Sequence, residues 1–300
     1  MIKIANAPCS WGVLEFVLEG EAAGFAQVLD EMQQTGYQGT ELGDWGFMPT
    51  DPLVLKSELA ARNLEMLSAF VPVDLSDPGA HAAGEDVAVR TASLLAEVGE
   101  QPFIVLADDN GKNPVRTKQA GRITAQEGLA RAEWDIFAAG AQRIARGVYD
   151  QTGVRTVFHH HCGGFVETPA EIDTLLSMTD LEVFGLCFDA GHYIFGGGDP
   201  VTGLRKHADR IWHVHFKDCH PEIAARSRAE GWDYFESVRN GIFCELGQGA
   251  VDFPALKAIL EELDYDGWIV VEQDVLPGMG RPKESAQRNR DYLAAIGFKQ

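Results

Sequence analysis

Acidic and basic side chains follow short apolar segments at several points of this chain, in a pattern that suits metal or proton chemistry. The segment 183–189 is apolar and ends in Asp189, and the segment 210–216 carries His213 and His215. Such short runs are typical of buried parallel strands, and in an α/β barrel the catalytic side chains project from the strand ends. An aspartate and a histidine on neighbouring strand ends would supply half of a divalent metal site.

Three consecutive histidines, His159, His160 and His161, form another polar strand end after the apolar residues Val157 and Phe158. Alternate side chains of a strand share a face, so His159 and His161 are expected to point into the mouth of the barrel while His160 faces the helices. Two neutral imidazoles on one face can hold a metal or relay protons. A single histidine would more often be a hydrogen-bonded core residue, but a pair facing two further polar strand ends favours a functional site.

Glu272 ends a further buried run, 267–272, and completes a set of nitrogen and oxygen donors. We therefore predict that four side chains hold a divalent cation: His159, Asp189, His215 and Glu272. This mixed set suits Mn²⁺, Co²⁺, Fe²⁺, Mg²⁺ or Zn²⁺, and its carboxylate content favours Mn²⁺ or Co²⁺ over a closed structural zinc. The structural alternative for Asp189 is that it caps the following turn.

Other residues near the strand ends could bind or convert a substrate. Lys217 lies at the rim, where a lowered pKa would suit proton transfer, although a plain salt bridge to Asp218 is the alternative. His192 could reach a substrate oxygen, and Glu41 could bind a sugar hydroxyl. Trp11, in the turn after the first strand, offers an aromatic platform for a ring, although a tryptophan is more often part of the core.

Strand-like and helix-like segments alternate along the chain, which predicts a parallel sheet covered by helices. Eight such pairs predict a (β/α)8 TIM barrel, an α/β fold that takes up residues 1–300 as a single domain. The strands are expected near 2–7, 39–43, 64–70, 102–107, 154–161, 183–189, 210–216 and 267–272, and the helices near 21–35, 51–62, 84–99, 125–151, 169–178, 199–207, 252–263 and 281–295. Two insertions, near 108–124 and 219–250, are expected on the face that carries the strand ends, as lids or substrate walls.

Composition narrows the choice of partners. The chain has 300 residues, with 45 acidic and 25 basic side chains, for a net charge of −20. This charge disfavours nucleic acid and anionic membranes as partners. The five cysteines form no CxxC pair, no signal peptide or membrane span is evident, and a soluble cytoplasmic protein is expected. GxGxxG, P-loop and GxSxG motifs are missing, which disfavours nucleotide-dependent and serine-hydrolase chemistry.

The strand ends 188–192, 213–218 and 271–274, together with the opening 7–12, resemble the xylose isomerase-like TIM-barrel superfamily of sugar isomerases and epimerases. Within it, Ser10-Trp11-Gly12, the three histidines and the Glu272-Gln273-Asp274 ending most resemble inosose dehydratases of inositol catabolism. The resemblance implies a metal held by Glu, Asp, His and Glu, of which Asp189, His215 and Glu272 match the last three. His159 stands where many members have the first Glu. Glu167, expected among the substrate-binding residues, is the alternative to His159 as the first ligand.

The same resemblance implies loss of water from a cyclic polyol ketone such as scyllo-inosose, through a metal-stabilised enediolate. The acid and the base would come from Lys217, His192 and His161, and Glu41 and Trp11 would orient the ring.

Three other functions stay open at this point. An isomerase or epimerase would use the same enediolate but return the proton, so that substrate and product have equal mass. A repair nuclease of related fold needs a basic groove, which the net charge disfavours. A sugar-binding barrel without activity would be stabilised by ligand but would not convert it.

These barrels often associate, so a homo-oligomer is expected without a specified interface.

Overall fold

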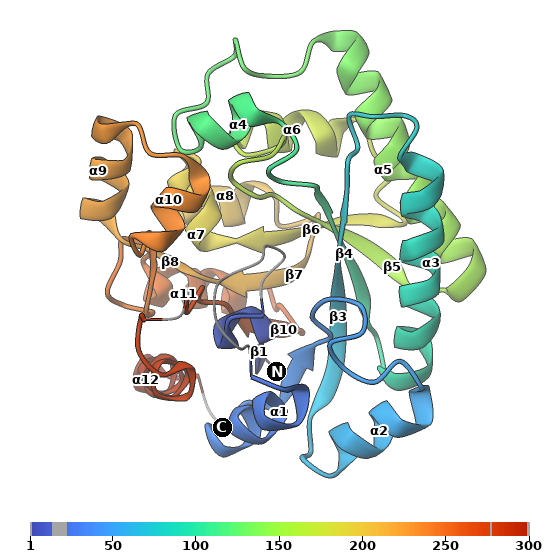
Figure 1. The fold of residues 1–300 in the computed structure, drawn as a ribbon, viewed down its shortest axis with the longest axis vertical. Coiled ribbons are helices and arrows are strands. Elements are labelled where there is room, and N and C mark those ends of the chain that lie inside the picture. Colours follow the sequence, from blue (N-terminus) through green and yellow to red (C-terminus); the bar gives the residue numbers. More distant parts are fainter. Residues whose placement is uncertain (1, 14–22, 277, 299–300) are drawn as a thin grey trace.

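The computed structural model describes residues 2–13, 23–276 and 278–298, and in it the strands close into a parallel barrel (Figure 1). The order around the barrel is β1-β10-β7-β6-β5-β4-β3-β2, so that each strand pairs with its neighbour in sequence and β1 closes on β10. The strands are β1 (Lys3–Asn6), β2 (Gly39–Glu41), β3 (Glu65–Val73), β4 (Phe103–Asp108), β5 (Arg155–His159), β6 (Phe184–Asp189), β7 (Ile211–Phe216) and β10 (Trp268–Val271). The predicted TIM barrel is confirmed.

Helices surround the barrel, and each predicted strand is followed by the predicted helix (Figure 1). Several begin at a side chain that accepts backbone N–H groups: Asp51, Thr168, Asp199 and Asp252. Such caps satisfy amide groups that have no partner within the helix. The helices are α1 (Phe25–Gln34), α2 (Pro52–Ala60), α3 (His81–Val98), α5 (Arg131–Thr152), α6 (Pro169–Ser177), α8 (Pro200–Lys206), α11 (Phe253–Glu262) and α12 (Pro282–Ala295).

Shorter elements are added mainly at the carboxyl ends of the strands. Asp218 anchors the segment between β7 and α11 by accepting the N–H groups of Gly247, Gly249 and Val251. The segment between β7 and α11 and the segment after β4 both lie at the end of the barrel where the strands finish (Figure 1). The added elements are η1 (Pro8–Trp11), α4 (Pro114–Gln119), α7 (Ala190–Phe195), β8 (Asp218–Cys219), α9 (Pro221–Glu230), α10 (Tyr234–Arg239) and β9 (Phe243–Cys244).

The interior of the barrel is filled differently at its two ends. At the amino ends of the strands, Trp268 packs over Gly39 and Trp212 packs over Gly185, and a methyl group added at either glycine would crowd the ring. At the carboxyl ends many of the interior side chains are charged or imidazole groups. Large rings therefore narrow the interior at the amino ends, where a second pocket lined by aromatic and charged side chains opens, whereas imidazole and carboxylate groups gather at the carboxyl ends.

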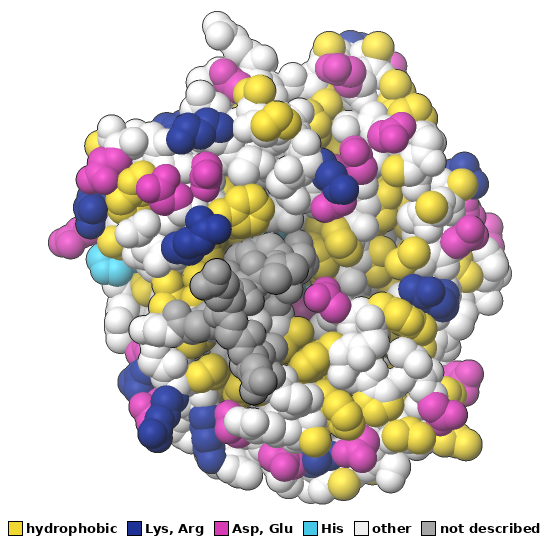
Figure 2. Space-filling model, in the orientation of Figure 1, with side chains coloured by type: hydrophobic (Ala, Val, Ile, Leu, Met, Phe, Trp, Pro, Cys, Tyr) yellow, Lys and Arg dark blue, Asp and Glu magenta, His cyan; other side chains and the backbone are white. Residues whose placement is uncertain are grey.

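The surface carries charges of both signs. In Figure 2 acidic and basic side chains are interspersed over the face shown, and the coloured residues form no continuous basic band there. The described residues visible on this face therefore form no basic groove of the kind that a nuclease needs. None of the helices in the described ranges is long and apolar enough to cross a membrane.

Asp108, at the end of β4, should make stability depend on pH. Burial raises the pKa of this carboxyl from 3.8 to about 7, although it accepts the N–H of Phe165 at 2.8 Å. Between these values the folded protein keeps a proton that the unfolded chain releases, so stability falls as pH rises. Asp108→Asn should flatten this loss, by up to about 1.4 kcal/mol per pH unit.

Urea unfolding of the wild type and of Asp108→Asn at several pH values between 5 and 8 measures this effect. Asp150→Asn, on the exposed surface of α5, is the matched control and should leave the slope unchanged. Parallel wild-type and Asp108→Asn curves would show that the buried carboxyl does not retain its proton.

Candidate active site

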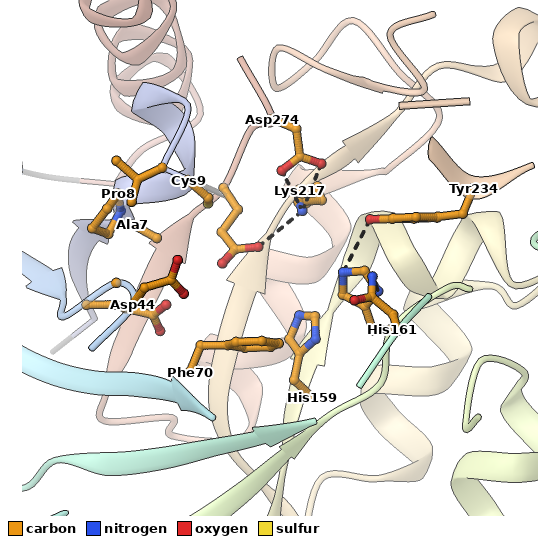
Figure 3. Close-up of a pocket in the computed structure, with 15 residues that line it drawn as sticks. Ala7, Pro8, Cys9, Asp44, Phe70, His159, His161, Lys217, Tyr234 and Asp274 are labelled. Atoms are coloured by element: carbon orange, nitrogen blue, oxygen red, sulfur yellow. Dashed lines mark hydrogen bonds and ion pairs between the residues drawn. The ribbon is translucent and has the colours of Figure 1, made fainter. Parts of the chain in front are cut away.

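A pocket opens at the carboxyl ends of the strands, and polar side chains from opposite sides of the barrel line it (Figure 3). Phe70 and Cys9 contribute less polar parts of the wall. The lining groups that can bind a cation or transfer a proton include Glu41, His159, His161, Lys217, Glu272 and Asp274. The pocket therefore collects residues from β2, β5 and the segments that follow β7 and β10.

Four side chains predicted to hold a metal converge beside this pocket: His159, Asp189, His215 and Glu272. One donor atom from each lies within 4.8 Å of all the others. His159 Nε2 lies 3.5 Å from Asp189 Oδ2, and His215 Nδ1 lies 3.3 Å from Glu272 Oε1. These separations leave room for a cation between the donors, which neighbouring strands β5, β6, β7 and β10 hold in place.

The donor atoms also lack other partners. Asp189 Oδ2, His215 Nδ1 and both ring nitrogens of His159 are buried and form no hydrogen bond to the described residues. Buried polar atoms without partners are costly, so a cluster of them facing one point indicates a bound group. Two imidazoles and two carboxylates suit a divalent transition metal. The residues of this site thus fit the metal that the sequence predicts.

Glu167 lies outside this cluster. Its carboxylate is fully buried and accepts the N–H groups of Gly121 at 2.7 Å and Gly163 at 3.0 Å. These bonds tie the loop after β5 to the segment after α4, and they direct the carboxylate away from the pocket. The structure corrects the expectation that Glu167 binds substrate or replaces His159 as a ligand.

Lys217 is buried at the pocket wall between two carboxylates. Its Nζ lies 3.2 Å from Glu272 and 3.4 Å from Asp274, and it stands over the ring of Phe243 at 4.6 Å. Burial alone would lower the pKa of this ammonium, but the carboxylates outweigh burial and hold its pKa well above the usual value. The expected lowered pKa is therefore wrong for the protein without a metal. The alternative pairing with Asp218 is also wrong, because Asp218 binds backbone N–H groups.

His161 presents one ring nitrogen to the pocket. Its Nδ1 lies 2.8 Å from the carbonyl oxygen of Cys162 and 3.2 Å from the amide nitrogen of Asn110, and the shorter contact assigns the proton to Nδ1 and the lone pair to Nε2. Nε2 lies 3.3 Å from the Tyr234 hydroxyl, which donates to it (Figure 3). Burial, aided by the nearby charge of Lys217, lowers the pKa of His161 to about 3. The ring is thus a neutral proton acceptor.

His192 lies behind these groups. Its ring packs against Phe243 at 4.6 Å, its Nδ1 accepts the N–H of Cys162, and its Nε2 is 3.5 Å from Lys217. It is fully buried and does not belong to the described lining of the pocket. The structure corrects the expectation that His192 touches a substrate oxygen and makes it a neighbour of Lys217 instead.

Trp11 and Glu41 differ in their relation to the pocket. Trp11 is buried in the core, donates its indole N–H to Glu31 at 2.7 Å, and is not among the described lining residues, which corrects its expected role as a platform. Glu41 does line the pocket, but its Oε1 is occupied by donors within the barrel. Whether its carboxylate also binds substrate stays a prediction.

Sequence reasoning missed four polar lining residues: Asp44, Asn110, Tyr234 and Asp274. Asp274 could have been found, because it lies two residues after Glu272 and alternation places both on one face. Asn110 and Tyr234 belong to the two insertions that were expected to form substrate walls. Nothing in the sequence singled out Asp44, which lies in the loop between β2 and α2.

Comparisons with known proteins agree with this architecture. The profile of the xylose isomerase-like TIM barrel family matches residues 19–296. The chain is 32% identical to inosose dehydratase from Clostridium botulinum (strain Alaska E43 / Type E3) over 293 residues, 97% of this chain and 96% of that protein. It is also 32% identical to inosose dehydratase from Lacticaseibacillus casei over 294 residues, 98% of this chain and 97% of that protein.

Solved structures share the fold at lower sequence identity. The probable 3-DHS dehydratase AsbF from Bacillus anthracis superposes with a TM-score of 0.70 at 16% identity, over 98% of this chain and 99% of that one. The 3-keto-D-glucoside 4-epimerase YcjR from E. coli superposes with a TM-score of 0.69 at 18% identity, over 99% of both chains. From its barrel, its strand-end residues and these matches, the chain belongs to the xylose isomerase-like TIM barrel family.

Proposed function

We propose that the protein is a metal-dependent dehydratase that removes water from a cyclic polyol ketone such as scyllo-inosose. The observation that carries this proposal is the convergence of four metal donors with a neutral imidazole and a buried ammonium at one pocket, where atoms of three of the donors have no hydrogen-bond partner among the described residues. Dehydration beside a carbonyl needs these three parts, a Lewis acid, a proton acceptor and a proton donor. The naming of full-length relatives as inosose dehydratases supports the substrate class.

His159, Asp189, His215 and Glu272 would hold the cation, with Mn²⁺ or Co²⁺ as the proposed metal. When bound, such a cation polarises a carbonyl and makes the hydrogen on the adjacent carbon more acidic. The chain's own groups perform the proton transfers. Neutral Nε2 of His161 accepts the α-hydrogen as a proton, and the ammonium of Lys217 gives a proton to the departing β-hydroxyl, which leaves as water.

Three neighbours support this division of roles. The Cys162 carbonyl holds the His161 tautomer that leaves Nε2 able to accept a proton. Asp274 and Glu272 keep Lys217 charged in the protein without metal, and Asp274 would still lie beside it if Glu272 held a cation. Asp44 and Asn110 are the wall residues that could bind ring hydroxyls.

Mass spectrometry of scyllo-inosose incubated with the protein tests the proposal. Protein stripped by a chelator should leave the substrate unchanged, and addition of Mn²⁺ or Co²⁺ should produce a compound lighter by one water. Stripping should lower the rate by at least about 1000-fold, because the metal contributes several kcal/mol of transition-state stabilisation. Equal rates with and without metal would contradict the proposed chemistry.

An isomerase or epimerase is the second candidate. The observation that favours it is that His161 and Lys217 approach the pocket from different strands, so one group could remove a proton and the other could return it. The same mass measurement separates the two functions, because an isomerase gives a product of unchanged mass. Chromatography of the products would then identify the new sugar.

A further inference from the structure

Glu41 ends the short strand β2 with its carboxylate buried inside the barrel. The register between β2 and β3 shifts between Thr40 and Glu41, so that Glu41 lies opposite Ser68. Such irregularities turn a strand and redirect the side chain at its end. Here the result is a carboxylate that crosses the barrel interior toward β7.

A single oxygen of this carboxylate gathers three donors. Glu41 Oε1 lies 2.7 Å from Ser68 Oγ, 2.9 Å from His213 Nε2 and 3.0 Å from His215 Nε2. A carboxylate only accepts at neutral pH, so both imidazoles carry their proton on Nε2 in these bonds.

The hydrogen bond from His215 Nε2 to Glu41 determines the state of the other ring nitrogen, Nδ1. With its Nε2 proton donated to Glu41, His215 can present the Nδ1 lone pair to a cation. That Nδ1 atom is the one that lies 3.3 Å from Glu272 Oε1 and 3.9 Å from Asp189 Oδ2, and it has no hydrogen-bond partner among the described residues. Without an acceptor at Nε2, the ring could turn or adopt the other tautomer, which protonates the donor atom.

We propose that Glu41 is a positioning residue that fixes the ring orientation and tautomer of His215 for metal binding. The inference rests on the metal dependence of the proposed function, and it adds a role that differs from direct contact with substrate. Metal-bound histidines usually donate their second N–H to a carboxylate or carbonyl, and loss of that partner typically weakens metal binding by about 10- to 100-fold. His213, in the layer below, donates to the same oxygen and so helps to hold the Glu41 carboxylate beside His215.

Titration of metal-free protein with Co²⁺, followed by its visible absorption, tests the proposal without any turnover. Glu41→Gln keeps the shape of the side chain but weakens the acceptor, and it should raise the Kd for Co²⁺ by about 10- to 100-fold. Glu65→Gln is the matched control, because Glu65 begins the neighbouring strand β3 and pairs with Lys3 at 2.8 Å, at the opposite end of the barrel. It should leave the Kd unchanged.

Circular dichroism and thermal melting establish that each variant folds. If Glu41→Gln does not fold, Glu41→Asp serves instead, because the shorter side chain withdraws the oxygen from His215 and should weaken Co²⁺ binding in the same direction. A wild-type Kd in folded Glu41→Gln would overturn the inference. So would a higher KM for scyllo-inosose with an unchanged Kd for Co²⁺, since that result assigns Glu41 to the substrate.

The proposed function can fail separately. If the wild-type protein bound neither Co²⁺ nor Mn²⁺, that result would disprove the metal site and, with it, the role of Glu41. If the wild-type protein and Glu41→Gln bound the metal equally tightly, that result would disprove only the role of Glu41. The two failures are therefore distinguished by the wild-type titration alone.

Discussion

Asp189→Asn should abolish metal binding and lower turnover by at least about 1000-fold, because the variant loses one charged donor and points an NH₂ group at the cation. The two oxygens of Asp189 have separate tasks. Oδ1 accepts the N–H of His192 at 2.8 Å and caps α7, whereas Oδ2 faces the metal donors without a partner. Asparagine keeps an oxygen for the cap, so the loss should fall on the metal site rather than on folding.

Asp199→Asn is the control for this substitution. Asp199 also caps a helix, α8, through the N–H groups of Val201 and Thr202, but it lies outside the pocket. Both variants should melt close to the wild type, and only Asp189→Asn should fail to bind Co²⁺ in the absorption titration. Normal Co²⁺ affinity in Asp189→Asn would show that the cation binds elsewhere in the chain.

The barrel and its metal donors could be predicted because the signals are local. A parallel strand buried on both faces is an apolar run, and a charged residue at its end stands out against that background. Asp189, His215 and Glu272 each show this pattern. Alternation along one strand then assigned His159 to the interior and His160 to the helices, where His160 packs against Phe188.

Contacts across the barrel could not be predicted in the same way. The state of Lys217 depends on Asp274, which reaches it only because β10 pairs with β7 when the barrel closes. Glu41 meets His213 and His215 across 172 and 174 residues of sequence, and a register shift in β2 directs it there. No periodicity in a single segment carries that information.

Local backbone geometry turns two other expected site residues, Trp11 and Glu167, away from the pocket. Trp11 closes a short 3-10 turn whose path buries the ring, and Glu167 is held by two backbone N–H groups of neighbouring loops. Both residues lie in loops, where the direction of a side chain depends on backbone angles rather than on strand alternation. Sequence placed them near the strand ends but could not show which way they point.

The division of labour between His161 and Lys217 leads to a second large effect. Lys217→Met should lower dehydration by about 100- to 10,000-fold, the usual contribution of a positioned acid, because no ammonium remains to protonate the departing hydroxyl. Methionine keeps the apolar contact with Phe243 but removes the charge beside Asp274. Lys206→Met, on the exposed end of α8, is the matched control and should retain full activity.

Incorporation of deuterium into recovered scyllo-inosose, run in D₂O with metal-loaded protein, separates the two proton transfers. Removal of the α-hydrogen precedes loss of the hydroxyl, so Lys217→Met should still exchange that hydrogen while it forms almost no product. His161→Asn should lose exchange and dehydration together, because the Nε2 acceptor is gone. The reverse pattern, with exchange lost in Lys217→Met and kept in His161→Asn, would make the lysine the base. It would also require the metal to lower the pKa of Lys217, which neighbouring carboxylates hold well above its usual value in the metal-free protein.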